Sequence, residues 1–98
     1  MIYVEVHYFV KKGQRDAFYQ AVKEAGIIAC SSSEQGNRKY DYYFSPVDPD
    51  EICLLEVWDT IEDQKAHGQT ENMKKLQALK AEYVERAVLN FYEAKAMD

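Results

Sequence analysis

The stretch EVWDTIEDQKAHGQTENM, Glu56–Met73, joins a predicted β-strand directly to a predicted helix. The predicted strand ends with Trp58 and Asp59. Thr60 is a good N-cap residue, and Asp63 at the third helical position completes a capping-box arrangement. His67 follows about one and a half turns into the helix. The first question is whether His67 is an ordinary helix residue or faces a cavity together with Trp58.

The helix is expected to continue beyond His67. Gly68 would weaken it in mid-course by about 1 kcal/mol relative to alanine, a cost tolerated more readily where something must approach closely. Thr70 is placed to cap the continuation. The apolar stripe of this continuation consists of Met73, Leu76, Leu79 and Tyr83.

The segments on either side complete an α+β pattern. IYVEVHYFV (2–10) alternates as a strand does, and a helix with Ala17, Phe18, Ala21, Val22 and Ala25 at helical spacing follows it. A Ser-rich loop, CSSSEQG, closes on Gly36. NRKYDYYFS, EICLLEVWD and RAVLNFYEAK are the second, third and fourth strands. The order βαββαβ predicts one ferredoxin-like domain over residues 1–98, with both helices on one face of an antiparallel sheet.

Composition excludes several classes of protein. The chain has 98 residues, 47% of them hydrophobic, and a formal net charge of −5, which argues against a nucleic-acid partner. No apolar run approaches membrane-spanning length, and we expect no signal peptide, because the strand pattern begins at Ile2. Cys30 and Cys53 match no metal or redox spacing, and there is no HExxH or glycine-rich nucleotide motif. We therefore expect no metal, no cofactor, reduced cysteines and a cytoplasmic protein.

The third and fourth strands are apolar on both faces. Ile52, Leu54 and Trp58 alternate with Cys53, Leu55 and Val57, and the fourth strand is similar. Helices on one face would leave the other as a large apolar patch in water. The pattern therefore predicts a homodimer through the sheet face.

Two residues of the opening stretch have alternative interpretations. His67 lies at the border of the buried stripe, so it is either a half-wet boundary histidine or a general base. Glu56, on the strand face of Trp58, is either an edge carboxylate paired with a lysine or a buried acid with a raised pKa. Trp58 alone indicates core packing.

Other polar candidates have ordinary interpretations as well. Asn37 after Gly36 is typical of a turn amide. Tyr40 is typical of half-buried packing. His7 is typical of an interface histidine whose hydrogen bonds are satisfied. The residues alone indicate a small pocket-bearing dimer and no named reaction.

Three segments together resemble the antibiotic biosynthesis monooxygenase family: VKKGQRDAF, SEQGNRKYDYY and LLEVWDTIEDQKAHGQTENMKKL. The family pattern is an E-x-G-N run with an aromatic residue after it, then E-x-W, then A-H near a Thr. The resemblance implies a cofactor-independent, dimeric α+β barrel. It places Asn37, Trp58 and His67 at the pocket as catalytic residues, with Tyr40 and Glu56 as substrate-binding residues.

The chemistry implied by the resemblance is oxygenation of a small aromatic molecule, a quinol or phenol. His67 would be the base or anion partner, and Asn37 and Trp58 would orient and stabilise the oxygen-bearing intermediate. Many relatives have a second histidine where this chain has Asn72, which argues against a two-histidine mechanism.

Relatives also suggest rival functions. One is an isomerase of a phosphorylated signal molecule, with Arg38 and Lys39 serving the phosphate. Haem degradation is disfavoured by Gln77 where those relatives carry a histidine. A non-catalytic dimer that binds a small ligand is the third alternative.

Overall fold

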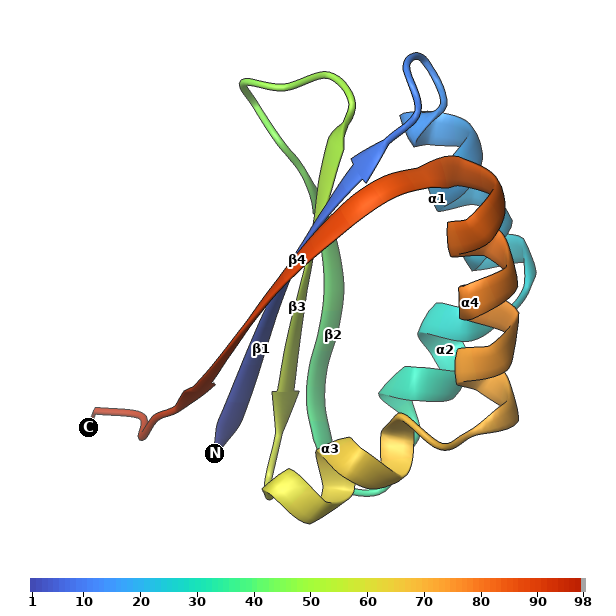
Figure 1. Ribbon diagram of the computed structural model, residues 1–98. Helices are drawn as coiled ribbons and strands as arrows, with labels where there is room; N and C mark the ends of the chain where they lie inside the picture. Colours follow the sequence, from blue (N-terminus) through green and yellow to red (C-terminus); the bar gives the residue numbers. More distant parts are fainter. Residues whose placement is uncertain (98) are drawn as a thin grey trace.

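The computed structural model describes residues 1–97, which form a four-stranded sheet and four helices. In chain order these elements are β1 (Ile2–Val10), α1 (Arg15–Glu24), α2 (Ile27–Ser32), β2 (Asn37–Phe44), β3 (Glu51–Trp58), α3 (Ile61–His67), α4 (Glu71–Tyr83) and β4 (Val84–Glu93). The strand order is β2-β3-β1-β4, and every neighbouring pair is antiparallel. The helices lie on one side of the sheet (Figure 1). This arrangement confirms the predicted ferredoxin-like α+β fold.

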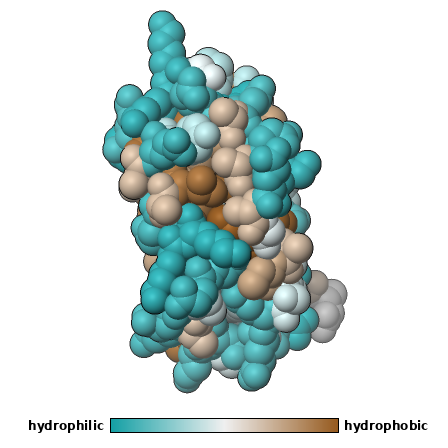
Figure 2. Space-filling model, turned by 90° about the vertical axis from the view of Figure 1, so that its right-hand side faces the viewer, coloured by the Kyte–Doolittle hydropathy of each residue, from teal (hydrophilic) through white to brown (hydrophobic). Residues whose placement is uncertain are grey.

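The core lies between the sheet and the helices. Along β1 every second residue is buried, from Ile2 to Val10, because successive side chains of a strand point to opposite faces. The helices cover this inner face with Phe18, Val22 and Leu76. Figure 2 views the helical layer, whose outer surface is largely hydrophilic around a smaller apolar region.

The Ser-rich segment differs from its prediction as a loop. Gly26, with φ of 74°, separates α1 from a second short helix, α2. Ile27 and Ser31 of α2 are completely buried. The Asn72 side-chain amide donates to the Ile27 carbonyl at 3.2 Å and to Ser31 Oγ at 2.8 Å. This tertiary contact from α4 stabilises a helix that the local sequence does not favour.

The helix predicted after Thr60 is two helices, α3 and α4. Both predicted caps are confirmed: Thr60 Oγ1 accepts from the Asp63 amide at 3.1 Å, and Thr70 Oγ1 accepts from the Met73 amide at 3.2 Å. Gly68 is the C-cap of α3 with φ of −66°. The prediction of a mid-helix glycine was therefore wrong, because the chain ends one helix at His67 and starts the next at Glu71.

Gly36 fixes the loop before β2 against the start of α3. Its φ is +79°, and a Cβ at this position would overlap the Asp63 side chain. The Asp59 amide also donates to the Gly36 carbonyl at 2.8 Å. Only glycine satisfies both the backbone angle and the close approach, so Gly36 positions the residues just before it, including Glu34.

The outer face of the sheet carries exposed apolar side chains. Tyr92 is 53% exposed there, and it lines a groove of about 470 Å³ with Tyr3 and Leu55. Leu89 and Phe91 lie opposite Val6 and Val4 on the inner face but remain about half exposed, because β4 is an edge strand. None of the helices within residues 1–97 is long and apolar enough to cross a membrane.

Candidate active site

His67 is buried at the C-terminal end of α3, with 4% of its surface exposed. Its Nδ1 lies 2.5 Å from Glu34 Oε1. Glu34 belongs to the loop that Gly36 holds against α3. The interpretation of His67 as a half-wet boundary residue was therefore wrong: position on α3 suggested a border, but the loop before β2 covers the ring.

Glu56 lies on the other side of the imidazole. Its Oε1 accepts a hydrogen bond from Trp58 Nε1 at 3.0 Å and lies 3.6 Å from His67 Nε2. Burial raises the pKa of Glu56 above its usual value, although the Trp58 hydrogen bond and the neighbouring His67 act to lower it. Of the two interpretations of Glu56, the buried acid is the one observed.

Aromatic rings surround the imidazole. The Trp58 ring centroid is 4.7 Å from that of His67, and Tyr40 meets His67 edge-on at 5.5 Å. Tyr40 is 2% exposed, more deeply buried than the half-buried packing predicted for it. Burial raises the pKa of its phenol, although the nearby Ser31 and Tyr42 side chains act to lower it. The Tyr40 hydroxyl makes no hydrogen bond of acceptable geometry among the described residues. A buried hydroxyl without a partner is costly unless a ligand or water completes it.

A cavity of about 110 Å³ lies between the sheet and the helices, and His67, Glu56, Tyr40 and Lys80 contribute to its wall. Its apolar wall includes Val4, Val6, Leu76, Leu89 and Phe91. An engineered apolar cavity of about 150 Å³ binds benzene, so this smaller space would admit at most a single ring. Burial lowers the pKa of Lys80.

A second pocket of about 260 Å³ lies on the Glu34 side of His67. It is lined by Glu34, Gln35, Asp63, Ala66, His67 and Thr70. His67 is the only residue that lines both spaces among those the structure describes. The imidazole therefore separates an inner cavity from a pocket nearer the surface.

Asn37 is placed differently from the other predicted site residues. It pairs with Trp58 across β2 and β3, but its amide donates to the Lys39 carbonyl at 3.0 Å. Its backbone N–H donates to the Glu34 carbonyl at 3.1 Å. The structure thus brings His67, Trp58, Glu56 and Tyr40 together, while Asn37 braces the loop that carries Glu34.

Sequence reasoning missed Glu34 and Lys80. Glu34 is the first residue of the E-x-G-N run, so the motif itself carried the signal. No sequence pattern indicated that Lys80 lines the cavity, because a lysine on a helix is usually solvated. The basic pair named for phosphate binding is already paired with acids: Arg38 binds Asp59, and Lys39 Nζ lies 3.6 Å from Asp41.

The arrangement suits acceptance of a proton. A carboxylate at Nδ1 favours the imidazole tautomer with its hydrogen on that nitrogen, and this leaves the Nε2 lone pair available. The 3.6 Å from Nε2 to Glu56 is too long for a hydrogen bond. His67 Nε2 can therefore contact a hydroxyl of a molecule in the inner cavity.

Comparisons with known proteins agree with this fold. The model of the antibiotic biosynthesis monooxygenase family matches residues 1–79. A Nitrosomonas europaea protein described as a "putative antibiotic biosynthesis monooxygenase" is 26% identical with a TM-score of 0.87, over 96% of this chain and 98% of that one. A conserved Bacteroides thetaiotaomicron protein of unknown function, described as a possible oxidoreductase, is 28% identical with a TM-score of 0.83, over 95% and 96%.

A conserved Methanosarcina mazei protein, 23% identical with a TM-score of 0.86 over 96% of this chain and 92% of that one, shares the fold. No curated protein matches the chain significantly. Because the family model covers most of the sequence and the fold agrees, the chain belongs to the antibiotic biosynthesis monooxygenase family.

Proposed function

We propose that this protein is a cofactor-independent monooxygenase that oxidises a small single-ring phenol or quinol, with His67 as the general base. The observation that carries the proposal is a buried imidazole held between two carboxylates at the wall of a cavity of about 110 Å³. General bases work best where a partner orients the ring and water is limited. Glu34 provides the orientation, and burial provides the exclusion of water.

The remaining polar groups of the cavity suit an anionic form of the substrate. Lys80 brings a positive charge to the wall of the cavity, which would stabilise a phenolate. The Tyr40 hydroxyl, without a partner of its own, can donate to a substrate oxygen. Trp58 forms part of the aromatic cluster and holds Glu56 through its N–H, and Asn37 keeps the Glu34 loop against β2.

The reaction balances without a further reductant for a phenol that carries hydrogen at the para carbon. His67 Nε2 takes the phenolic proton, and the electron-rich ring reduces O₂. A C–O bond forms at the para carbon and the O–O bond breaks. The para C–H bond breaks as one oxygen atom becomes the second quinone oxygen, and the other oxygen atom leaves as water with the phenolic hydrogen and the para hydrogen.

Oxygen consumption with a panel of single-ring phenols and quinols tests this proposal. We expect stoichiometric O₂ uptake with at least one substrate, and one atom of ¹⁸O from ¹⁸O₂ in its product. Ligands that raise the melting temperature of the protein without any turnover across the panel would instead identify a binding protein.

The isomerase alternative has a separate test. A phosphate site should make inorganic phosphate raise the melting temperature. We expect no shift, because Arg38 is engaged by Asp59 and Lys39 lies beside Asp41. A clear stabilisation that is lost in Arg38→Gln would favour the isomerase.

A further inference from the structure

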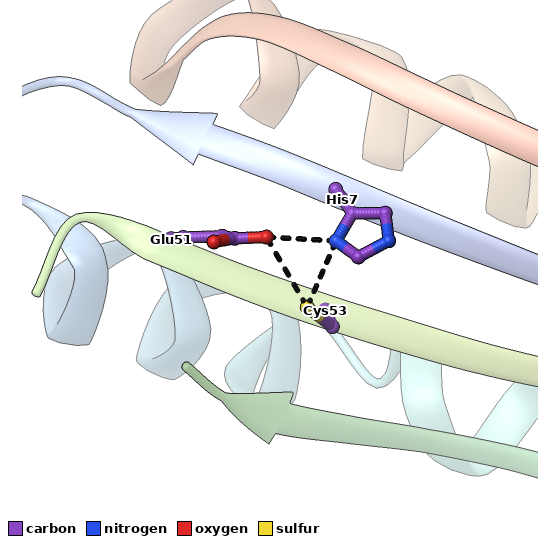
Figure 3. A group of neighbouring side chains, drawn as sticks. All are labelled: His7, Glu51 and Cys53. Carbon is purple, nitrogen blue, oxygen red and sulfur yellow. Dashed lines mark hydrogen bonds and ion pairs between the residues drawn. The ribbon is translucent and has the colours of Figure 1, made fainter. Parts of the chain in front are cut away.

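A second cluster of chemically active side chains lies on the opposite face of the sheet from the His67 cavity. It consists of His7 on β1 and of Glu51 and Cys53 on β3 (Figure 3). His7 and Cys53 are direct cross-strand partners, although 46 residues separate them in the sequence. Glu51 lies two residues before Cys53 and therefore on the same strand face. We propose that this cluster is a binding site for a divalent transition-metal ion, with Zn²⁺ as the preferred ion.

The separations between the three ligand atoms support the proposal. Cys53 Sγ lies 3.3 Å from His7 Nδ1 and 3.6 Å from Glu51 Oε2. Tetrahedral zinc with ordinary Zn–N, Zn–O and Zn–S lengths requires about 3.5 Å for both separations. The distance from His7 Nδ1 to Glu51 Oε2 is 2.7 Å, where tetrahedral zinc requires about 3.3 Å. One hydrogen bond therefore has to open by about 0.6 Å for the ion to enter.

The second nitrogen of His7 is also engaged in the way a metal ligand requires. Its Nε2 lies 3.1 Å from Glu5 Oε1, and Asn90 Nδ2 donates to the same carboxylate oxygen at 3.2 Å. Metal-bound histidines usually donate their other N–H to a carboxylate, which fixes the ring and strengthens its basicity. Glu5 would act as this positioning residue.

Charge and access are compatible with a cation. Two carboxylates flank one imidazole, so a neutral imidazole leaves the cluster with excess negative charge. Imidazole, carboxylate and thiolate together are ligands typical of zinc. In the single chain the side chains of His7 and Glu51 are 30% and 17% exposed, so water can supply the fourth ligand before a second copy covers this face of the sheet.

No metal site was predicted from the sequence, because known metal-binding motifs have ligands that lie close together in the chain. Here the ligands come from two paired strands, and strand alternation places them on one face. The site is separate from the His67 cavity, so its test does not depend on the proposed monooxygenase activity.

Titration of the purified full-length protein with Co²⁺, followed by displacement with Zn²⁺, tests the site. We expect one ion per chain and a thiolate-to-cobalt charge-transfer band in the near ultraviolet that Zn²⁺ abolishes. The two cysteines provide a matched pair of variants, because Cys30 is exposed on α2. Cys53→Ser should lose the band, and Cys30→Ser should keep it.

Two further variants keep the test valid if Cys53→Ser fails to fold. Glu51→Gln should weaken Co²⁺ binding at least tenfold, and Glu5→Gln should weaken it by about 10- to 100-fold. No charge-transfer band in wild-type protein with excess Co²⁺ would overturn the proposal. A band retained in Cys53→Ser, or wild-type affinity in Glu51→Gln, would overturn it equally.

Discussion

Glu56 is the residue whose ionisation should affect stability most directly. Burial raises its pKa above the usual value of 4.5, so the folded chain binds this proton more tightly than the unfolded chain does. The associated stability is complete below the usual pKa and is lost as the pH rises through the folded pKa. Glu56→Gln should remove this loss, and its free energy of unfolding relative to wild type should increase with pH. Parallel urea-unfolding profiles over a pH series would contradict this prediction.

Glu34 should act through His67, to which it is bound. Glu34→Gln should lower kcat by at least about tenfold, since a mis-oriented imidazole is a poor base, while KM changes little. The exposed residue Glu82 on α4 provides a matched control, Glu82→Gln, which should leave O₂ consumption unchanged. Equal rates in the two variants would remove Glu34 from the mechanism.

The residues of the site were only partly predictable from the sequence. Trp58 and Glu56 could be assigned to one strand face from alternation alone. The burial of His67 could not, because the covering residue, Glu34, lies 33 positions earlier in the chain. The roles proposed for His67, Asn37, Trp58, Tyr40 and Glu56 remain predictions.

Among the structural elements, the loop before β2 determines how α3 meets the sheet. Gly36→Ala should cost about 1–3 kcal/mol, because it combines a left-handed backbone angle with overlap against Asp63. Gly26 has a similar φ of +74° but open space around it, so Gly26→Ala should cost only about 1 kcal/mol. Urea denaturation of both variants measures the difference. A Gly36→Ala variant as stable as Gly26→Ala would contradict this account of the loop.

The contact between α2 and α4 depends on Asn72. Asn72→Ala should lower the free energy of unfolding by about 1–3 kcal/mol, because the Ile27 carbonyl and Ser31 Oγ would lose their donor. The exposed residue Gln69 supplies a control, and Gln69→Ala should stay within about 0.5 kcal/mol of wild type. Equal stability of the two variants would show that these hydrogen bonds contribute nothing.

Strands and caps were predictable because their signals are local, whereas the helix boundaries were not. Alternation determined β1, and the Thr60 and Thr70 caps follow from adjacent residues. The helix α2 includes Cys30, Ser31 and Ser32 because of Asn72, a partner more than 40 residues away. Local propensity cannot reveal such a tertiary contact.

For the whole molecule, we propose a homodimer through the outer face of the sheet. Tyr92, Tyr3 and Leu55 border an exposed groove of about 470 Å³ on that face, and a second copy would cover it. Light scattering at micromolar concentration should report a dimer for wild type and a monomer for Tyr92→Glu. Val47→Glu, at an apolar residue that is 90% exposed in the β2–β3 turn, should remain dimeric. A monomeric wild-type protein would exclude this interface.

The most direct test of the proposed function is to separate binding from turnover in His67→Gln. A substrate identified from the phenol panel should bind His67→Gln in the absence of O₂ with an affinity within a few-fold of that for wild type. Its aerobic kcat should fall by about 10²- to 10⁴-fold, the usual contribution of a general base. Turnover at the wild-type rate in a folded His67→Gln variant would contradict the role of His67 as the base.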